Sequence, residues 1–222
     1  MITVHHLENS RSQRVLWLLE ELELEYELKS YARHPKTSLG PPELREIHPL
    51  GKSPIITDDE ITVAESGAIL EYLTTTYGKH LIPEAGTPEH RSYIYWLHYA
   101  EGSLMPPLLL KLIFSKVRSA PMPFFVKPIA KGIAKQVEKA FIHPQLSLHI
   151  GFVESQLEKT TWFAGDDFTA ADVQMSFPLE AVIARGTAGK EYPNISEFVK
   201  RIHNRPAYQR AIEKGGTYQL MS

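Results

Sequence analysis

Residues 47–67 read IHPLGKSPIITDDEITVAESG, and this segment carries the strongest indication of the architecture. It predicts two short strands, 54–57 and 61–64, joined by a polar turn. A helix is expected over 65–77, because Gly78 is a favourable end signal. A strand pair followed by a helix is typical of one half of a small α/β layer.

The proline that opens this strand pair predicts an unusual turn. Proline cannot donate a hydrogen bond to a strand ladder, so a special turn is expected there, and a cis Ser53–Pro54 bond would suit it. Such a turn presents the backbone of Ser53 outward, where an extended peptide ligand could pair with it by strand addition. An ordinary tight turn is the alternative.

The residues upstream complete the α/β layer. The run 2–7 predicts a strand, and apolar residues at helical spacing over 15–22 predict a helix. A second short strand is expected at 26–29. The order β-α-β, break, β-β-α predicts a small α/β domain in residues 1–80.

Downstream, residues 88–222 show no strand pattern and are predicted to form an all-α domain. Prolines and a glycine over 83–88 indicate the linker between the two domains. The pair Pro106-Pro107 predicts a kink in the first long helix. The five expected helices cover 91–116, 125–157, 169–185, 195–204 and 206–214.

The composition of the 222 residues excludes several chemistries. The chain contains no cysteine, so disulfides, thiolate zinc sites and cysteine nucleophiles are excluded, and any reactive thiol must arrive on a ligand. The ten histidines show no metal-binding spacing, so no metal is expected. A net charge of −2 favours neither nucleic acid nor an anionic membrane as partner. The chain lacks a signal-peptide pattern and a membrane-length apolar run, so a cytoplasmic protein is expected.

Ser10 is the first candidate for chemistry, because it lies between the first strand and the first helix. A serine at this place can simply cap the helix. The same geometry also lets its hydroxyl donate to an anion such as a thiolate, beside the positive end of the helix and the side chains of Arg11 and Arg14. The residues alone leave both interpretations open.

Glu65 and Ser66 stand where a strand ends and a helix begins. They are favourable capping residues. Unpaired N–H groups at a helix start also bind carboxylates, and Glu65 could hold an ammonium group beside them. A site for both charges would suit an amino-acid moiety.

Two further patterns have mainly structural interpretations. Thr169 to Asp172, TAAD, is typical of a helix-capping box with Asp in the usual Glu/Gln place, so both residues are expected to stabilise the fold. Residues 111–139 carry seven Lys/Arg and one acid, Glu138. This basic stretch indicates a solvated helix face, with an anion or protein-partner site as the alternative.

Taken in order, the motifs resemble those of a cytosolic-type glutathione transferase of the serine type. The resemblance covers essentially the whole chain, and further segments are similar to a fungal and bacterial branch of that family. The family motifs are Ser10 to Arg14, Gly51 to Pro54, Glu65-Ser66, Thr169 to Asp172 and RPAY at 205–208. The branch segments are IHPLGKSP at 47–54, EGSLMPP at 101–107, APMPF at 120–124 and MSFP at 175–178.

The resemblance implies a thioredoxin-like N-terminal domain, a helical C-terminal domain and a homodimer. It also implies a cis Pro54, with the Ser53 backbone pairing with the cysteinyl part of glutathione. Glu65 and Ser66 would hold the γ-glutamyl ammonium and carboxylate, and Lys52 would lie near the glycyl carboxylate. Leu39 stands near the position of a histidine that theta-like members use for that carboxylate. The possible substitutes are Arg33, His34 and Lys36.

The resemblance also implies roles around the thiol. Ser10 matches the serine that activates the thiol, with a backbone N–H or the Asn9 amide as alternative donors. Glu101 is placed to reach the glutathione of a partner subunit. The second substrate, a hydrophobic electrophile, would contact residues of the first long helix: Tyr99, Ser103, Met105 and Leu108.

The expected function is therefore that of a glutathione transferase, with glutathione as co-substrate and no permanently bound cofactor. Its thiolate would attack hydrophobic electrophiles or reduce organic hydroperoxides. The alternative is a non-catalytic module of the same fold that binds protein partners through the basic stretch 111–139.

Overall fold

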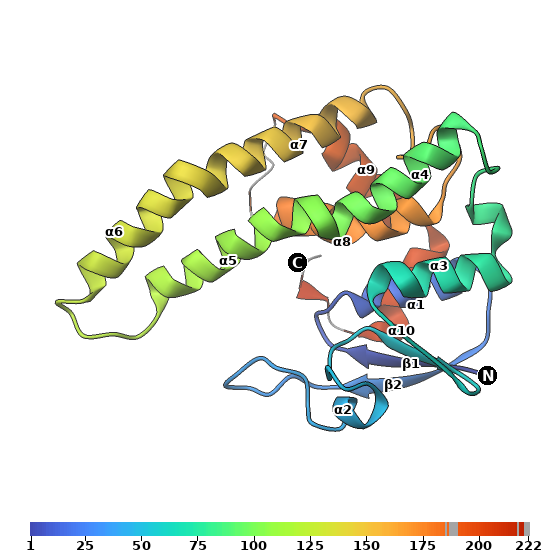
Figure 1. Cartoon of the computed structure of the whole chain (residues 1–222), viewed down its shortest axis with the longest axis horizontal. Coiled ribbons are helices and arrows are strands. Elements are labelled where there is room, and N and C mark those ends of the chain that lie inside the picture. Colours follow the sequence, from blue (N-terminus) through green and yellow to red (C-terminus); the bar gives the residue numbers. More distant parts are fainter. Residues whose placement is uncertain (185, 187–190, 217, 220–222) are drawn as a thin grey trace.

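The computed structural model describes residues 1–184, 186, 191–216, 218 and 219, and its N-terminal part is an α/β layer. The strands and both helices expected there are all present (Figure 1). A short helix, α2, was not predicted, because it lies in the proline-rich segment. The elements are β1 (Ile2–Leu7), α1 (Ser12–Glu21), β2 (Tyr26–Tyr31), α2 (Leu44–Ile47), β3 (Ile55–Asp58), β4 (Ile61–Ala64) and α3 (Ser66–Tyr77).

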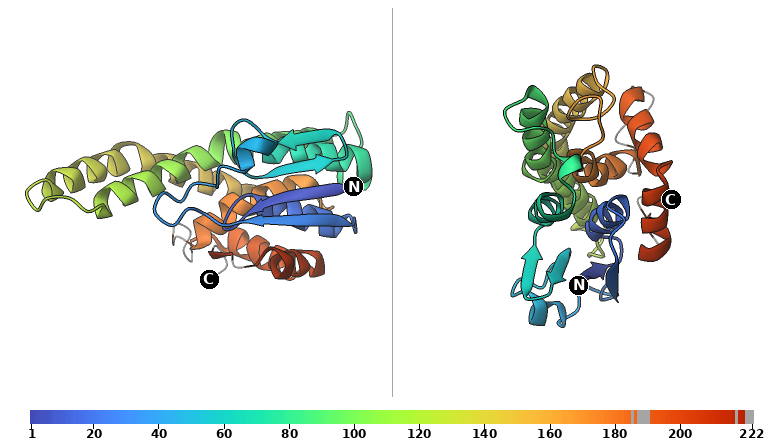
Figure 2. Two further views of the ribbon diagram at one scale, coloured as in Figure 1. Left: turned by 90° about the horizontal axis from the view of Figure 1, so that it is seen from below. Right: turned by 90° about the vertical axis from the view of Figure 1, so that its right-hand side faces the viewer.

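The sheet has the strand order β2-β1-β3-β4. β1 pairs in parallel with β2 and antiparallel with β3, and β3 pairs antiparallel with β4. All six residues of β1 are buried, because this strand lies inside the sheet. The end-on view in Figure 2 shows α1, α3 and the helices that follow on one side of the sheet, with the short α2 on the other.

From Pro88 to Gly215 every described regular element is a helix. The helices α5 and α6 form a long hairpin that projects from the body (Figures 1 and 2). α8 lies at the centre, and its residues from Ala170 to Val182 are all buried. The elements are α4 (Pro88–Tyr99), α5 (Met105–Ser119), α6 (Lys127–Val137), α7 (His143–Leu157), α8 (Ala170–Ala184), α9 (Pro193–His203) and α10 (Pro206–Gly215), with π-helical turns at Ala100–Leu104 and Glu138–Ile142. The last predicted residue of the helix 169–185 lies outside the described residues.

The break in the first long helix differs from the prediction. The kink was expected at Pro106-Pro107, but the irregular turn is the π-helical turn Ala100–Leu104, one turn earlier. The two prolines then fall in the first turn of α5, where a missing N–H costs little. The π-helical turn therefore accommodates the two prolines, and it contains Glu101.

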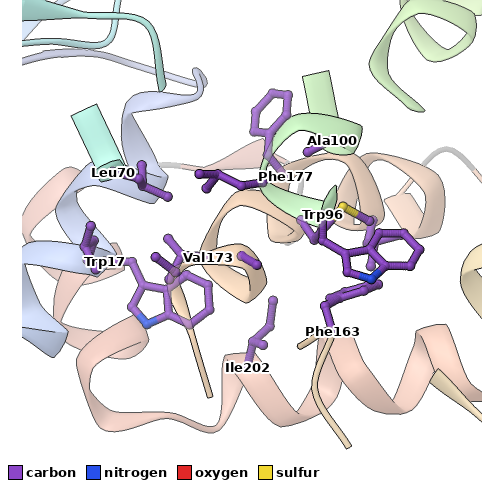
Figure 3. Close-up of a cluster of buried hydrophobic side chains, with 14 of the residues drawn as sticks. Trp17, Leu70, Trp96, Ala100, Phe163, Val173, Phe177 and Ile202 are labelled. Carbon is purple, nitrogen blue, oxygen red and sulfur yellow. The ribbon is translucent and has the colours of Figure 1, made fainter. Parts of the chain in front are cut away.

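One hydrophobic core runs through both parts of the chain (Figure 3). Trp17 of α1 and Leu70 of α3 pack beside Val173 of α8, while the rings of Trp96 and Phe163 lie 4.8 Å apart further along the same core. This shared core fixes the first turns of α1 and α3 against the helical part. In the part of the chain that the structure describes, no helix has the length and apolar character needed to cross a membrane.

Candidate functional site

A cavity of about 300 Å³ lies between the turn before β3, the start of α3 and the π-helical turn Ala100–Leu104. It brings together Lys52, Ser53, Glu65, Ser66 and Glu101, which the sequence had singled out from distant segments. A larger hollow of about 830 Å³ near β2 and α10 includes none of these residues. The lining residues of the smaller cavity are Arg11, His48, Leu50, Lys52, Ser53, Pro54, Ala64, Glu65, Ser66 and Glu101.

The turn before β3 contains a cis Ser53–Pro54 peptide bond. The Ser53 hydroxyl donates to the carbonyl of His5 over 3.0 Å and accepts from the N–H of Leu7 over 3.3 Å, which fixes the turn to β1. Among the described residues, no backbone group pairs with the N–H or the carbonyl of Ser53. The cavity therefore presents a free segment of strand edge, which can receive an extended peptide.

The start of α3 supplies a second set of free donors. The first backbone hydrogen bond of the helix joins the N–H of Ile69 to the carbonyl of Glu65 over 2.9 Å, so the preceding N–H groups have no partner within the helix. Glu65 has a φ of +75°, in the region that favours glycine, and its side chain is exposed beside the cavity. A non-glycine residue held in this conformation is typical of a functional site.

Arg11 and Glu101 line one wall of the cavity, and the buried side chain of Arg14 contacts Glu101. Arg11 donates through Nε to both oxygens of Glu101, over 2.9 and 3.1 Å, and Arg14 donates to the same carboxylate. Burial would raise the pKa of Glu101, but the charges of Arg14 and Arg11 outweigh it, so its pKa lies below the usual value. The cluster thus carries two positive charges and one negative charge, a net charge that favours an anion.

Arg14 is a buried charged residue whose contacts the sequence did not reveal. Its side chain is only 1% exposed, and it donates to both the carbonyl and the side-chain oxygen of Gln174 in α8, each over 2.8 Å. It also donates to the Ser66 hydroxyl over 3.4 Å and lies over the ring of Phe177. The one signal in the sequence was an arginine on the apolar side of the first helix.

Ser10 does not line the cavity, although its neighbour Arg11 does. Its side chain is 6% exposed, and its hydroxyl lies 2.7 Å from that of Ser12. Asn9 has a φ of +49°, and its side-chain oxygen accepts from the backbone of Gln219 over 2.7 Å. The Ser10 hydroxyl is therefore engaged within the protein, whereas in Asn9 the side-chain oxygen, not the amide donor, is engaged.

The residues predicted to contact the electrophile are not brought to the cavity. Tyr99, Met105 and Leu108 are buried in the core, and only Ser103 is partly exposed. The Tyr99 hydroxyl is hydrogen-bonded to Nδ1 of His149 in α7 over 2.5 Å. The π-helical turn is wider than a regular helical turn. The side chains that follow it therefore point in other directions than they would in a regular helix.

Most of the residues predicted to bind the glycyl carboxylate line a second cavity of about 380 Å³, next to the first. Lys52 lines both cavities and is exposed. Arg33 also lines the second cavity, but its guanidinium donates to the carbonyls of Glu8, Asn9 and Ser38 and so stabilises the loops. His34 lines it as well, whereas Lys36 does not.

The predicted helix cap lies apart from the cavity, at the start of α8. The fully buried carboxylate of Asp172 accepts from the N–H of Phe163 over 2.9 Å, and from the N–H and the hydroxyl of Thr169 over 2.8 and 3.0 Å. These three bonds tie the preceding loop to the central helix, which is a structural arrangement.

The sheet order, the cis-proline turn and the helical part that shares its core define a class of proteins with a thioredoxin-like N-terminal domain and an all-helical C-terminal domain. The chain belongs to the glutathione S-transferase family: residues 1–75 match its N-terminal domain and residues 117–206 its C-terminal domain.

Individual relatives agree with this assignment along the whole chain. Glutathione S-transferase 3 of Schizosaccharomyces pombe is 37% identical, over 96% of this chain and 88% of that protein. Glutathione S-transferase 1 of Saccharomyces cerevisiae is 36% identical, over 96% of this chain and 95% of that protein. The crystal structure of a glutathione S-transferase from Actinobacillus pleuropneumoniae is 35% identical, with a TM-score of 0.82, and the match covers 100% of this chain and 96% of that one.

Proposed function

We propose that this chain is a glutathione transferase that binds glutathione in the cavity beside Ser53 and transfers its thiolate to hydrophobic electrophiles. One observation carries the proposal: the cavity joins a free strand edge, a free helix start and charged side chains of both signs. A peptide with an ammonium group and carboxylates at its ends needs this combination.

Each part of glutathione has a partner in this proposal. The backbone of Ser53 pairs with the cysteinyl residue. The Ser66 hydroxyl and the free N–H groups of α3 hold the γ-glutamyl carboxylate, and Glu65 holds the ammonium group. Lys52 faces the glycyl carboxylate. Glu101 supports this site within its own chain by fixing Arg11 and Arg14, and contact with a partner subunit's glutathione stays a prediction.

The thiol must then be made nucleophilic. A free thiol has a pKa of about 8.5, so lowering it by about two units needs about 2.7 kcal/mol of preferential thiolate stabilisation. Three contributions together have this magnitude. They are the first turn of α1, a hydrogen bond from Ser10, and the net positive charge of the cluster formed by Arg11, Arg14 and Glu101.

The second substrate is proposed to be hydrophobic and to approach from the α4–α5 side, where Ser103 is partly exposed. The same thiolate could reduce an organic hydroperoxide. In that reaction two glutathione molecules lose two electrons to form the disulfide, while the peroxide becomes an alcohol and water.

Isothermal titration with glutathione and with S-methylglutathione tests the proposal. Binding of both, at one per subunit and micromolar to millimolar affinity, is expected, because the strand edge and helix start recognise the peptide rather than the sulfur. Conjugation of an electrophilic aromatic chloride should then be detectable. If neither peptide binds at millimolar concentration, the proposal is wrong, and the partner-binding alternative would lead.

Ser10→Ala is expected to lower kcat for conjugation at least about tenfold while the protein still folds, because it removes the hydroxyl proposed to donate to the thiolate. Steady-state kinetics together with the unfolding curve provide the check. An unchanged kcat would leave Ser10 with a structural role alone.

We also infer a homodimer, because apolar side chains are exposed together on α4 and α7. The rings of Tyr95 and Phe152 lie 6.2 Å apart, and both side chains are nearly half exposed. Exposed apolar groups of this kind are typical of an interaction surface. Phe152→Glu is expected to shift the protein from dimer to monomer in light scattering. Phe124→Glu, in the loop between α5 and α6, is the matched control and should leave the dimer intact.

A further inference from the structure

Three buried polar side chains form a chain of hydrogen bonds behind the cavity. The Ser10 hydroxyl lies 2.7 Å from that of Ser12, which lies 2.8 Å from Nδ1 of His6. On its other side, Nε2 of His6 lies 3.0 Å from the carbonyl of Gly215 in α10. The side chains are 6%, 0% and 3% exposed in the order Ser10, Ser12 and His6, so bulk water does not interrupt the chain.

The direction of each hydrogen bond can be derived by starting from the Gly215 carbonyl. A carbonyl can only accept, so Nε2 of His6 must carry a proton and donate to Gly215. In neutral His6, Nδ1 is then an acceptor 2.8 Å from the Ser12 hydroxyl, closer than the Leu7 carbonyl at 3.3 Å, and Ser12 donates to it. Because the Ser12 proton is committed, Ser10 must donate to Ser12, and its own oxygen accepts from the Ser12 N–H over 3.2 Å.

This arrangement has a consequence for Ser10. While His6 is neutral, the Ser10 proton points into the protein, so this hydroxyl cannot donate to a thiolate. It can instead accept a proton. When His6 is protonated at both nitrogens, it donates to Ser12 and still donates to Gly215. The nearer acceptor for the Ser12 proton is then Ser10, at 2.7 Å against 3.3 Å for the Leu7 carbonyl, and with that bond formed the Ser10 proton is free to point outward.

We propose that His6 is the internal base that takes the glutathione thiol proton, through Ser10 and Ser12. This inference rests on the proposed function and adds the route of the proton to it. The thiol S–H bond breaks as its proton passes to the Ser10 oxygen, the Ser10 proton moves to Ser12, and the Ser12 proton moves to Nδ1 of His6. The products are a thiolate that accepts a hydrogen bond from Ser10 and an imidazolium, with no change in total charge.

The surroundings of His6 suit a base that is neutral before the thiol arrives. Burial lowers the pKa of His6, while the bond to Gly215 and the charge of Glu8 oppose this shift. Glu8, the residue that follows β1, is the charged side chain acting on it. The other packed elements contribute uncharged groups: Ser12 from α1, the Gly215 carbonyl from α10, and Ser30 from the paired position in β2. Glu8 is thus placed to stabilise the imidazolium that the transfer creates.

This transfer of a proton from the thiol through Ser10 and Ser12 to His6 is a proton relay. The relay is tested in the wild-type protein by counting the protons released when glutathione binds. The thiolate formed on binding is measured by its ultraviolet absorbance, and the protons released are measured by titration calorimetry in buffers of different ionisation enthalpy. S-methylglutathione, which has no thiol proton, provides the blank. We expect clearly fewer than one proton released per thiolate, because His6 retains it. Release of one proton per thiolate would overturn the relay.

Variants separate the relay from a structural role. Ser12→Ala breaks the chain, and we expect either at least about tenfold less thiolate at neutral pH or one proton released for each thiolate formed. Ser12→Thr keeps the hydroxyl and should restore the wild-type proton count. Unchanged binding of S-methylglutathione by both variants would show that the pocket is intact. If Ser12→Ala matched the wild type in both thiolate and protons, the relay would be excluded.

The two proposals fail in different ways. If S-methylglutathione does not bind to the wild type, the peptide site is wrong and the relay falls with it. If it binds, and glutathione releases a full proton for each thiolate, the peptide site stands and only the relay is wrong. The wild-type count decides this even if a variant does not fold.

Discussion

Asp172→Ala is expected to lower the free energy of unfolding by about 3–5 kcal/mol, the largest effect on stability that we predict. The substitution leaves three donors without an acceptor: the N–H of Phe163, and the N–H and hydroxyl of Thr169. All three donors bond to Asp172 in the buried first turn of α8, where water cannot replace the carboxylate. Denaturation in urea, followed by circular dichroism, measures the loss.

Thr169→Ala is the matched control for Asp172→Ala. It removes one donor and leaves the two backbone N–H groups bonded to Asp172, so a loss of only about 1 kcal/mol is expected. Equal losses in the two variants, or a loss below about 1.5 kcal/mol for Asp172→Ala, would show that the carboxylate does not hold the loop to α8.

Glu65→Gly is expected to weaken glutathione binding about ten- to a hundredfold while raising the free energy of unfolding by about 1 kcal/mol. The affinity falls because the proposed partner of the ammonium group is lost. The stability rises because glycine adopts a φ of +75° without the strain that a glutamate carries there. Titration calorimetry and urea unfolding of the same preparation measure both quantities.

Glu65→Ala separates these two effects. Alanine also lacks the carboxylate, so the same loss of affinity is expected, but it keeps the strained backbone and should bring no gain in stability. A normal affinity in both variants would remove Glu65 from the binding site. A lower stability for Glu65→Gly than for Glu65→Ala would show that the strain argument is wrong.

Much of the fold was predictable because its signals are local. The strands at 2–7 and 61–64 follow from runs of apolar residues, and the end of α3 follows from Gly78. The residues from Lys52 to Ser66 meet at one cavity because a single strand pair and its flanking turns place them there. A short segment of sequence contains this information.

The rest depends on contacts between distant segments. Nothing near Arg14 in the sequence indicates that it bonds to Gln174, 160 positions away. The π-helical turn that carries Glu101 reflects how α4 and α5 pack together, and the burial of Tyr99 depends on α7. The direction of the Ser10 hydroxyl depends on a carbonyl in α10, so no local motif could have revealed it.

The bond between Arg14 and Gln174 also limits when the site can form during synthesis of the chain. Arg14 leaves the ribosome early, but its partners arrive only when α8 has been translated, and the Gly215 carbonyl that orients His6 comes later still. A nascent chain that ends within α7 can contain the whole sheet and still lack both the support of the charged wall and the orientation of the relay. The site can therefore be complete only after the chain as far as Gly215 has left the exit tunnel.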